Sequence, residues 1–179
     1  MINGKIGYLG GFNIGDEYLG QGKLGYWRDT HLRIVGDAVY SLQSRFFIDW
    51  NAAVHEDKRR EFIPEYFPVV ESMGQNTIQV VSTGPDASLQ KIKLGLIKMI
   101  SMAKKSVWIQ TPYFIPDESV QEALSIAALS GVDVRIMIPS KPDHPIVYRA
   151  TEFYASQIIQ SGGKVYVYQN GFLHAKTMI

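Results

Sequence analysis

The sequence predicts an α/β protein built around a mixed or mostly parallel sheet flanked by helices. Beyond residue 75, short apolar segments alternate with longer stretches in which apolar residues recur every three or four positions. This alternation is typical of strands and helices that follow one another in an α/β sheet. Residues 132–138 are almost all apolar, as buried parallel strands tend to be. Hydrophobic residues make up 46% of the chain, which is enough to form a core.

The first 50 residues are predicted to form two strands and a helix. Residues 5–9 are typical of a strand that runs into the glycine turn 10–13, and a glycine-rich polar loop occupies 15–25. A second strand, with alternating polar and apolar positions, covers 30–35. Asp37 is a candidate N-cap for the helix that follows. The apolar positions of that helix are Val39, Leu42, Phe46 and Trp50.

Residues 51–75 lack a clear period and are predicted to connect two domains. This segment contains the charge run 55–60, which is followed by Pro64 and Pro68. The chain therefore divides into residues 1–50, the connector 51–75, and residues 76–179. The first of these parts is expected to be an incomplete copy of the architecture of the third.

The third part has the most regular pattern. Its predicted strands cover 77–81, 106–111, 132–138 and 164–168. The turn 84–86 precedes a first helix, and Asp117 is the candidate N-cap of a second helix, which Gly131 ends. A third helix runs through 147–158 and ends at the glycine pair 162–163. One face of the first helix is predicted to carry Leu89, Ile92, Leu96, Met99 and Ala103.

Composition argues against several classes of function. A net charge of +1 gives no overall basic field of the kind that attracts nucleic acid. The chain has no cysteine, which excludes disulfides and thiolate metal sites. No apolar run approaches the roughly 20 residues that span a bilayer, and no signal peptide precedes the first predicted strand. The cluster 55–57 suggests a metal, but no second ligand group has suitable spacing, so neither metal nor cofactor is predicted.

His174 and Lys176 are the strongest candidates for catalysis. On a strand, residues two positions apart face the same side, so the imidazole and the ammonium would point into one site. This pair suits attack on a phosphate, because histidine bonds to phosphorus or passes a proton while lysine neutralises the phosphoryl oxygens. The alternative interpretation of the isolated pair is a histidine at a strand end beside a solvated lysine.

The two ends of the chain resemble parts of the H-x-K-x4-D motif of the phospholipase D superfamily. In residues 170–179 the motif's aspartate would fall two positions after Ile179. Residues 10–13 resemble the Gly-[Gly/Ser]-x-Asn that follows this aspartate in the family, and Asn3 stands where the aspartate belongs. Both ends are therefore expected to be cut inside the motifs, and the chain by itself is expected to be inactive. Whether Asn3 impairs the first motif stays open.

Five blocks of sequence, in order and with matching spacing, resemble bacterial cardiolipin synthases. They are residues 10–20, 26–31, 82–86, 110–117 and 170–176. The resemblance implies a phospholipase D-like fold of two pseudo-symmetric halves, the first incomplete, with one H-x-K-D motif from each half. It also implies that no metal is needed.

The mechanism that the resemblance implies uses two histidines. One attacks a phosphodiester to form a phosphohistidine, and the other protonates the leaving alcohol and then deprotonates the incoming one. In a cardiolipin synthase, the phosphatidyl group of one phosphatidylglycerol passes to the terminal hydroxyl of another, and glycerol is released. His174 and Lys176 would be the second motif's pair, with His174 preferred for acid/base catalysis, although the sequence does not decide which histidine is the nucleophile.

Substrate contacts are predicted at Asn13, Ser82 and Tyr113. The Asn13 amide would bind phosphate oxygens or hold a catalytic group, or it simply serves the glycine turn. Ser82 precedes a predicted helix N-terminus, where phosphate binds readily, or is only a turn residue. Tyr113 lies in an apolar loop at a strand end and either contacts lipid or packs in the interior. Residues 27–31 are either an exposed strand edge with an ion pair or part of the site.

The expected partners are phosphatidylglycerol and cardiolipin in the membrane, with no nucleic acid and an oligomeric state that the sequence leaves open. The parent protein is expected at the bacterial cell membrane, with its catalytic part on the cytoplasmic face. Two alternatives remain: another phospholipase D-type phosphodiesterase, and a catalytically impaired binding module. Asn13 and His174 are expected to approach one another, because both motifs would meet in one site.

Overall fold

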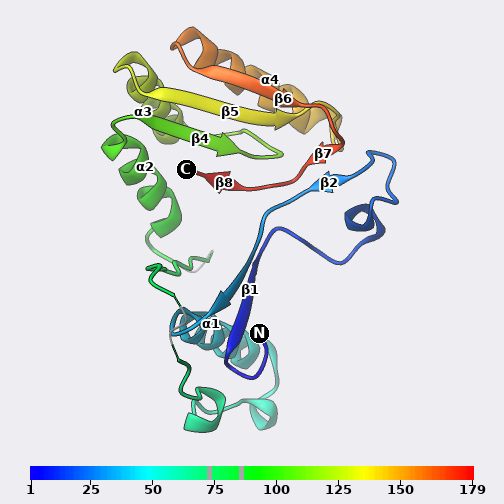
Figure 1. The fold of residues 1–179 in the computed structure, drawn as a ribbon, viewed down its shortest axis with the longest axis vertical. Helices are drawn as coiled ribbons and strands as arrows, with labels where there is room; N and C mark the ends of the chain where they lie inside the picture. The colour runs from blue at the N-terminus through cyan, green and yellow to red at the C-terminus, as the bar shows by residue number, and fades with distance from the viewer. Residues whose placement is uncertain (72–73, 85–86) are drawn as a thin grey trace. The chain divides into compact units, whose positions relative to one another are not determined.

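The computed structural model describes residues 1–71, 74–84 and 87–179 (Figure 1). The chain forms two compact units. The first unit contains Met1–Gly10 and His31–Leu89, and the second contains Gly11–Thr30 and Gln90–Ile179. Residues 11–30, although close to the N-terminus, therefore fold with the C-terminal part of the chain.

The first unit is built on a two-stranded antiparallel sheet and one helix. Strand β1 (Ile6–Gly10) pairs with β3 (His31–Val35), and helix α1 (Ala38–Ala53) packs beside them. A Cβ atom at Gly7 would lie 2.7 Å from a methyl carbon of Leu42, so this glycine lets the helix approach the strand closely. Both strands and the helix follow the sequence prediction. Asp37 is at the N-cap position as expected, but its side chain forms no capping hydrogen bond.

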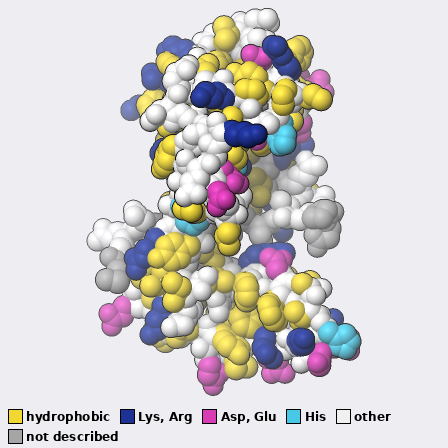
Figure 2. All heavy atoms as spheres, turned by 90° about the vertical axis from the view of Figure 1, so that its right-hand side faces the viewer, with side chains coloured by type: hydrophobic (Ala, Val, Ile, Leu, Met, Phe, Trp, Pro, Cys, Tyr) yellow, Lys and Arg dark blue, Asp and Glu magenta, His cyan; other side chains and the backbone are white. Residues whose placement is uncertain are grey.

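The stretch predicted as a connector packs against α1 with its aromatic side chains. It contains two short 3-10 helices, η2 (Glu56–Lys58) and η3 (Pro64–Tyr66). The buried ring of Phe47 lies 5.2 Å from the ring of Phe62, and it also contacts the rings of Tyr66 and Phe67. Hydrophobic side chains also gather on the surface of this unit, in the lower half of Figure 2.

The second unit contains a four-stranded mixed sheet with the strand order β6-β5-β4-β8. Strands β4 (Ser106–Gln110), β5 (Asp133–Pro139) and β6 (Lys164–Tyr168) are parallel, and the short β8 (Thr177–Met178) pairs antiparallel with β4. The prediction of an α/β protein with a mixed sheet flanked by helices is confirmed. The three parallel strands agree with their predicted positions to within one or two residues.

Helices α2 (Lys91–Met102), α3 (Glu118–Leu129) and α4 (Pro145–Gln160) pack on one face of this sheet (Figure 1). On the other face, Trp108 and Tyr166 are each 42% exposed, so helices cover only one face of the sheet in the described part of this unit. No helix among the described residues is long and apolar enough to cross a membrane. The core between sheet and helices contains Ile100, Val107, Phe114, Leu124, Ala127, Val134, Ile136, Ile138, Ala155 and Ile158.

Two predicted features near residue 80 are wrong. Residues 77–81 form no strand, because no described segment pairs with them through backbone hydrogen bonds and all of them except the partly buried Val80 are exposed. The next helix begins at Lys91, later than expected, so that Leu89 precedes it. The predicted turn residues 85–86 lie outside the described residues.

A short parallel pair of strands, which the sequence did not predict, joins the two segments of the second unit, Gly11–Thr30 and Gln90–Ile179. Strand β2 (Trp27–Arg28) pairs with β7 (Phe172–Leu173), and the 3-10 helix η1 (Asp16–Leu19) lies beside β2. Gly171 has a φ of +103°, and a Cβ atom there would collide with the carbonyl of Tyr26. Glycine is therefore required for this close pairing.

Asp117 caps α3 as predicted, and its charge should stabilise the second unit in a pH-dependent way. Its carboxylate accepts hydrogen bonds from the Lys93 ammonium (2.8 Å) and the Val120 backbone N–H (3.0 Å), which lower the pKa of Asp117 to about 2. A depressed pKa means that the stabilisation is complete above the usual carboxyl pKa and is lost as the pH falls from about 4 to about 2.

We expect Asp117→Ala to lower the Tm of the chain by about 3 °C at neutral pH, since the cap and the ion pair are both lost. The difference from the unmodified chain should shrink below pH 4. Thermal unfolding followed by circular dichroism across this range measures the effect, with Asp57→Ala as an exposed control. A difference that stays constant down to pH 2 would contradict the role of the ionised carboxylate.

Candidate active site

The backbone of the β2–β7 pair sets the position of His174. The carbonyl of Arg28 accepts hydrogen bonds from the backbone N–H groups of His174 (2.8 Å) and Ala175 (3.1 Å). Arg28 lies opposite Leu173 in the strand register, so the next residues along the two segments, Asp29 and His174, emerge side by side. Two residues that are 145 positions apart in the sequence are thus brought together by one short ladder of hydrogen bonds.

The ring of His174 is oriented by the carboxylate of Asp29. The distance from His174 Nδ1 to Asp29 Oδ2 is 2.6 Å, and the side chains are only 12% and 4% exposed. The other carboxylate oxygen accepts the backbone N–H of Thr30 at 2.7 Å. Because an ionised carboxylate can only accept hydrogen bonds, Nδ1 of the imidazole must carry the proton. In the neutral ring, Nε2 then keeps its lone pair for chemistry.

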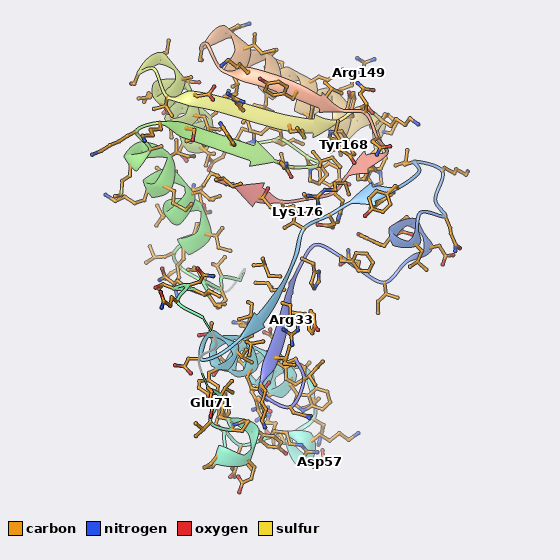
Figure 3. All side chains as sticks on the ribbon, in the orientation of Figure 1. Arg33, Asp57, Glu71, Arg149, Tyr168 and Lys176 are labelled. Carbon is orange, nitrogen blue, oxygen red and sulfur yellow. The ribbon has the colours of Figure 1, made fainter. Side chains whose placement is uncertain are left out.

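Lys176 lies against the imidazole and contacts both ring nitrogens, with Nζ 3.3 Å from Nδ1 and closer to Nε2. Its Nζ lies 3.0 Å from His174 Nε2 and donates to the His174 carbonyl at 2.8 Å. Figure 3 labels Lys176 on the segment between β7 and β8. Desolvation lowers the pKa of Lys176, while the charge of Asp29 acts in the opposite direction. The two residues predicted as a catalytic pair are therefore in contact.

Asn13 reaches His174 through Tyr18. The Asn13 side-chain amide donates to the Tyr18 hydroxyl at 3.0 Å, and this hydroxyl lies 3.4 Å from His174 Nδ1. The Tyr18 ring is buried and meets the imidazole edge-on, with 5.5 Å between the centroids. Burial raises the pKa of Tyr18, so the phenol stays protonated at neutral pH. The structure thus brings Asn13 and His174 into one network, as expected.

Gly11, next to Asn13 in the glycine turn, makes room for the Asp29 carboxylate. A Cβ atom at Gly11 would lie 2.6 Å from both oxygens of Asp29. Any other residue here would displace the carboxylate or the turn. The glycine turn therefore contributes to the site in two ways: Gly11 leaves space for the Asp29 carboxylate, and Asn13 supplies its side-chain amide.

Aromatic rings surround the imidazole on the remaining sides. The ring centroids of Trp27 and Phe172 lie 5.1 and 6.2 Å from that of His174, and these two rings contact each other at 4.6 Å. Phe172 is fully buried. Such packing restricts the rotation of the imidazole and keeps water away from its Nδ1 side, which strengthens the hydrogen bond to Asp29.

Tyr113 and Asp143 form a second polar pair in the same unit. Tyr113 follows β4 and Asp143 follows β5, so both lie at the carboxyl edge of the parallel strands, where α/β proteins commonly bind ligands. The Tyr113 hydroxyl donates to Asp143 Oδ2. Burial and this hydrogen bond raise the pKa of Tyr113, with a smaller contribution from Tyr18, so the two phenols are close enough to interact electrostatically.

Ser82 and Asn3, which the sequence analysis also singled out, lie in the first unit. Ser82 is exposed in a segment without regular secondary structure, and no helix begins directly after it. Asn3 occupies a turn with a φ of +50°, a conformation that asparagine adopts more readily than most residues. His55 pairs with Asp57 at an exposed position, and no three potential metal ligands gather anywhere in residues 1–71, 74–84 and 87–179.

Three residues of the network were not assigned to a site by the sequence. Asp29 lies in residues 27–31, for which the sequence allowed two interpretations, an exposed strand edge or part of the site. Tyr18 lies in the stretch that was predicted as a glycine-rich polar loop. Asp143 lies in a loop to which the sequence analysis gave no role. Burial of its carboxylate distinguishes Asp29 from the other acidic residues near it in the sequence. The sequence alone does not show that a loop residue is buried.

Comparisons with known proteins show which proteins this chain resembles. The family profile described as "Cardiolipin synthase, PLD-like domain" matches residues 96–179. Over its whole length, the chain is 57% identical to cardiolipin synthases of Listeria welshimeri serovar 6b and Listeria innocua serovar 6a. It is 56% identical to a cardiolipin synthase of Staphylococcus aureus (strain Mu50). The chain spans 37% of the length of the Listeria proteins and 36% of the Staphylococcus protein.

The fold is also found in a solved structure. The crystal structure of phosphatidylserine synthase from Haemophilus influenzae Rd KW20 matches 98% of this chain and 49% of its own, with a TM-score of 0.58 and 16% identity. At this identity the likeness concerns the fold alone, which is the expected phospholipase D-like α/β fold. Residues 96–179 therefore match the phospholipase D-like domain model of the cardiolipin synthases, and the whole chain is closely similar in sequence to one segment of these enzymes.

Proposed function

We propose that this chain is part of a cardiolipin synthase that transfers the phosphatidyl group of one phosphatidylglycerol to the terminal hydroxyl of another. The observation that carries the proposal is the imidazole of His174, held between the Asp29 carboxylate and the Lys176 ammonium. The identity of 57% to cardiolipin synthases over the whole chain supports the choice of substrate.

The arrangement around His174 suits a reaction at phosphorus. Asp29 keeps the proton on Nδ1 and stabilises the positive charge that develops on the ring when Nε2 takes a proton or forms a bond. Lys176 contacts both ring nitrogens and is closer to Nε2, and its ammonium would neutralise the phosphoryl oxygens of a diester bound there. Asp29 is thus a positioning residue, and His174 and Lys176 are the catalytic residues.

The proposed reaction has two steps. In the first, a histidine nitrogen bonds to the phosphorus of phosphatidylglycerol, the bond from phosphorus to the glycerol oxygen breaks, and an acid protonates the departing glycerol. In the second, the same group removes the proton from the terminal hydroxyl of another phosphatidylglycerol, whose oxygen replaces the histidine on phosphorus. We assign the acid and base role to His174, and the nucleophile to the histidine of the family's other motif.

The remaining predicted contacts have distinct proposed roles. The Asn13 amide, already bonded to Tyr18, would keep the Tyr18 hydroxyl directed at the imidazole or turn to a phosphate oxygen. Tyr113 would contact the headgroup from the loop after β4, with its hydroxyl held by Asp143. For Ser82, contact with the substrate stays a prediction from the sequence. No metal or cofactor takes part in the proposed reaction.

We further propose that the reaction takes place at the cytoplasmic face of the bacterial cell membrane, where phosphatidylglycerol is the substrate and cardiolipin the product. The parent protein would be held there by segments outside this chain. Phosphatidylglycerol is an anionic lipid that stays in the bilayer, so the site must meet it at the membrane surface.

A chimera allows the activity to be tested. The chain replaces the matching segment of the Listeria welshimeri cardiolipin synthase, and the product is expressed in bacteria that lack cardiolipin. We expect cardiolipin to form, His174→Ala to lower its formation at least about a thousandfold, and Lys176→Ala about a hundredfold. Mass spectrometry of lipid extracts measures the product, and His55→Ala, at an exposed ion pair, is the matched control.

Several outcomes would reject parts of the proposal. Full turnover with His174→Ala would exclude the mechanism. Hydrolysis of phosphatidylglycerol to phosphatidic acid without cardiolipin would favour another phosphodiesterase, and an inactive chimera that still binds phosphatidylglycerol would favour a binding module. After rapid quenching, a phosphatidyl adduct on His174 would show that this histidine is the nucleophile instead of the acid and base.

The role of Asp29 predicts a change of tautomer in Asp29→Asn. An asparagine amide can donate to Nδ1, which would move the ring proton to Nε2 and block its lone pair. We expect about a hundredfold loss of activity in the chimera and a shift of His174 from the Nδ1–H to the Nε2–H tautomer. Imidazole ¹⁵N chemical shifts measure the tautomer, and Asp57→Asn beside His55 is the control. An unchanged tautomer with full activity would contradict the role.

The proposed headgroup contact predicts a different kinetic effect for Tyr113→Phe. The phenyl ring keeps the packing but loses the hydroxyl that Asp143 holds, so one hydrogen bond to the substrate should be lost. We expect the KM for phosphatidylglycerol to rise about fivefold, with kcat changed little. Steady-state kinetics in mixed micelles measures this, with Tyr166→Phe on the open sheet face as control. A fall in kcat at constant KM would place Tyr113 in the chemical step.

A further inference from the structure

Helix α2 presents an apolar surface to the outside of the second unit. Its inner side packs towards α3 and contributes the buried Ile100 to the core. Its outer side carries large apolar residues that are about half exposed or more. They are Ile92 (46%), Leu94 (51%), Met99 (54%) and Met102 (63%).

The same surface is positively charged. Residues 87–116 contain lysines but no aspartate or glutamate, although the net charge of the whole chain is only +1. Lys93 pairs with Asp117. Within the described part of the chain, the remaining lysines of this stretch form no salt bridge, so their charge is available to a partner. These are Lys91, Lys98, Lys104 and Lys105.

The apolar surface continues across a hollow between α2 and α3. This hollow of about 360 Å³ is lined by Ile97 and Ala103 on one side and by Ala123 and Ile126 on the other. Ile126 is itself 64% exposed. Two neighbouring helices therefore share one apolar surface, to which α2 contributes the lysines and α3 contributes Ile126 and Glu122.

We propose that this surface, the outer face of α2 with its extension to Ile126, docks on an anionic phospholipid bilayer. A helix of this kind places its apolar side chains at the level of the lipid headgroups, while its lysines contact the lipid phosphates. Each basic residue near an anionic membrane surface strengthens binding about fivefold. Glu122 also lines the hollow, but the lysines of α2 outnumber it, so the surface keeps a charge that is complementary to such a membrane.

The inference rests on the proposed function, because it identifies how the catalytic unit reaches a substrate that stays in the membrane. The ion pair between Lys93 and Asp117 ties the first turn of α2 to the end of the loop after β4, which carries Tyr113. Docking through α2 would thus bring the carboxyl edge of the sheet close to the lipid headgroups. Phosphatidylglycerol could then enter the site without leaving the bilayer completely.

Vesicle cosedimentation of the 179-residue chain tests this directly. Vesicles of phosphatidylglycerol and phosphatidylcholine in equal parts are compared with pure phosphatidylcholine at about 0.15 M salt. We expect the chain to bind the anionic vesicles at least about tenfold more tightly than the phosphatidylcholine vesicles. High salt should weaken binding to the anionic vesicles. Lys91→Gln with Lys98→Gln should weaken binding about 25-fold, because two basic contacts are lost. Leu94→Ser with Met99→Ser should weaken it about as much at unchanged charge.

Matched variants control for charge and hydrophobicity. Lys5→Gln with Lys58→Gln makes the same charge change at exposed positions of the first unit, and Ile146→Ser with Ile159→Ser removes exposed apolar groups from α4. Both should bind like the unmodified chain, and circular dichroism checks that every variant is folded. No binding to anionic vesicles, or equal loss in the control variants, would overturn the proposal. So would equal affinity for double-stranded DNA, since this would indicate a general polyanion site.

Failure of this inference can be told from failure of the proposed function. In the chimera, the α2 variants should lose activity on vesicles but keep it on phosphatidylglycerol dispersed in detergent micelles, where no bilayer has to be reached. Loss of activity on both would show that α2 serves the catalytic fold and would overturn the docking role. An unmodified chimera that is inactive on both would reject the proposed function, while the vesicle-binding result would still decide the docking surface.

Discussion

The parallel pairing of β2 with β7 is the constraint on which the candidate site depends. These two strands are only two residues long, yet they join residues near position 28 to residues near position 173. The Arg28 carbonyl holds the backbone of His174, and the following residue, Asp29, supplies the carboxylate for its ring. If the pair slipped by one residue, Asp29 would face Leu173 instead, since side chains alternate along a strand.

The residues around β2 and β7 allow both the close pairing of the strands and the burial of the Asp29 carboxylate. Gly171 allows the two backbones to approach, and Gly11 leaves the space that the Asp29 carboxylate occupies. The Thr30 backbone N–H satisfies the second oxygen of that carboxylate, and Tyr18 links the imidazole to Asn13. A buried carboxylate is costly unless its hydrogen bonds are made, so these contacts explain how Asp29 can be only 4% exposed.

In the second unit, the proposed catalytic residues and the proposed membrane-docking surface lie on different elements. The His174 network lies where β2 meets β7, whereas the lysine-rich outer face of α2 lies on the helical side of the sheet. Between the two, the loop after β4 carries Tyr113 and ends at Asp117, which is tied to α2 by Lys93. Membrane attachment and headgroup recognition would thus be coupled through one loop of the fold.

The sequence by itself determined the elements whose pattern is local. The strands β4, β5 and β6, the helices between them and the cap at Asp117 follow from periodicity and capping chemistry, which act over a few residues. The motif around His174 and Lys176, and the resemblance that it carries, were equally visible in the sequence, and the family comparison agrees with that resemblance.

Only the tertiary structure decided which distant residues complete the site and where apparent elements fail. Asp29, Tyr18 and Asp143 contact side chains far along the chain, and residues 77–81 form no strand because no described segment pairs with them. The grouping of residues 11–30 with the C-terminal unit was likewise hidden. Local pattern reports the preference of a segment, whereas hydrogen-bond partners and burial depend on contacts between segments, which only the folded chain brings together.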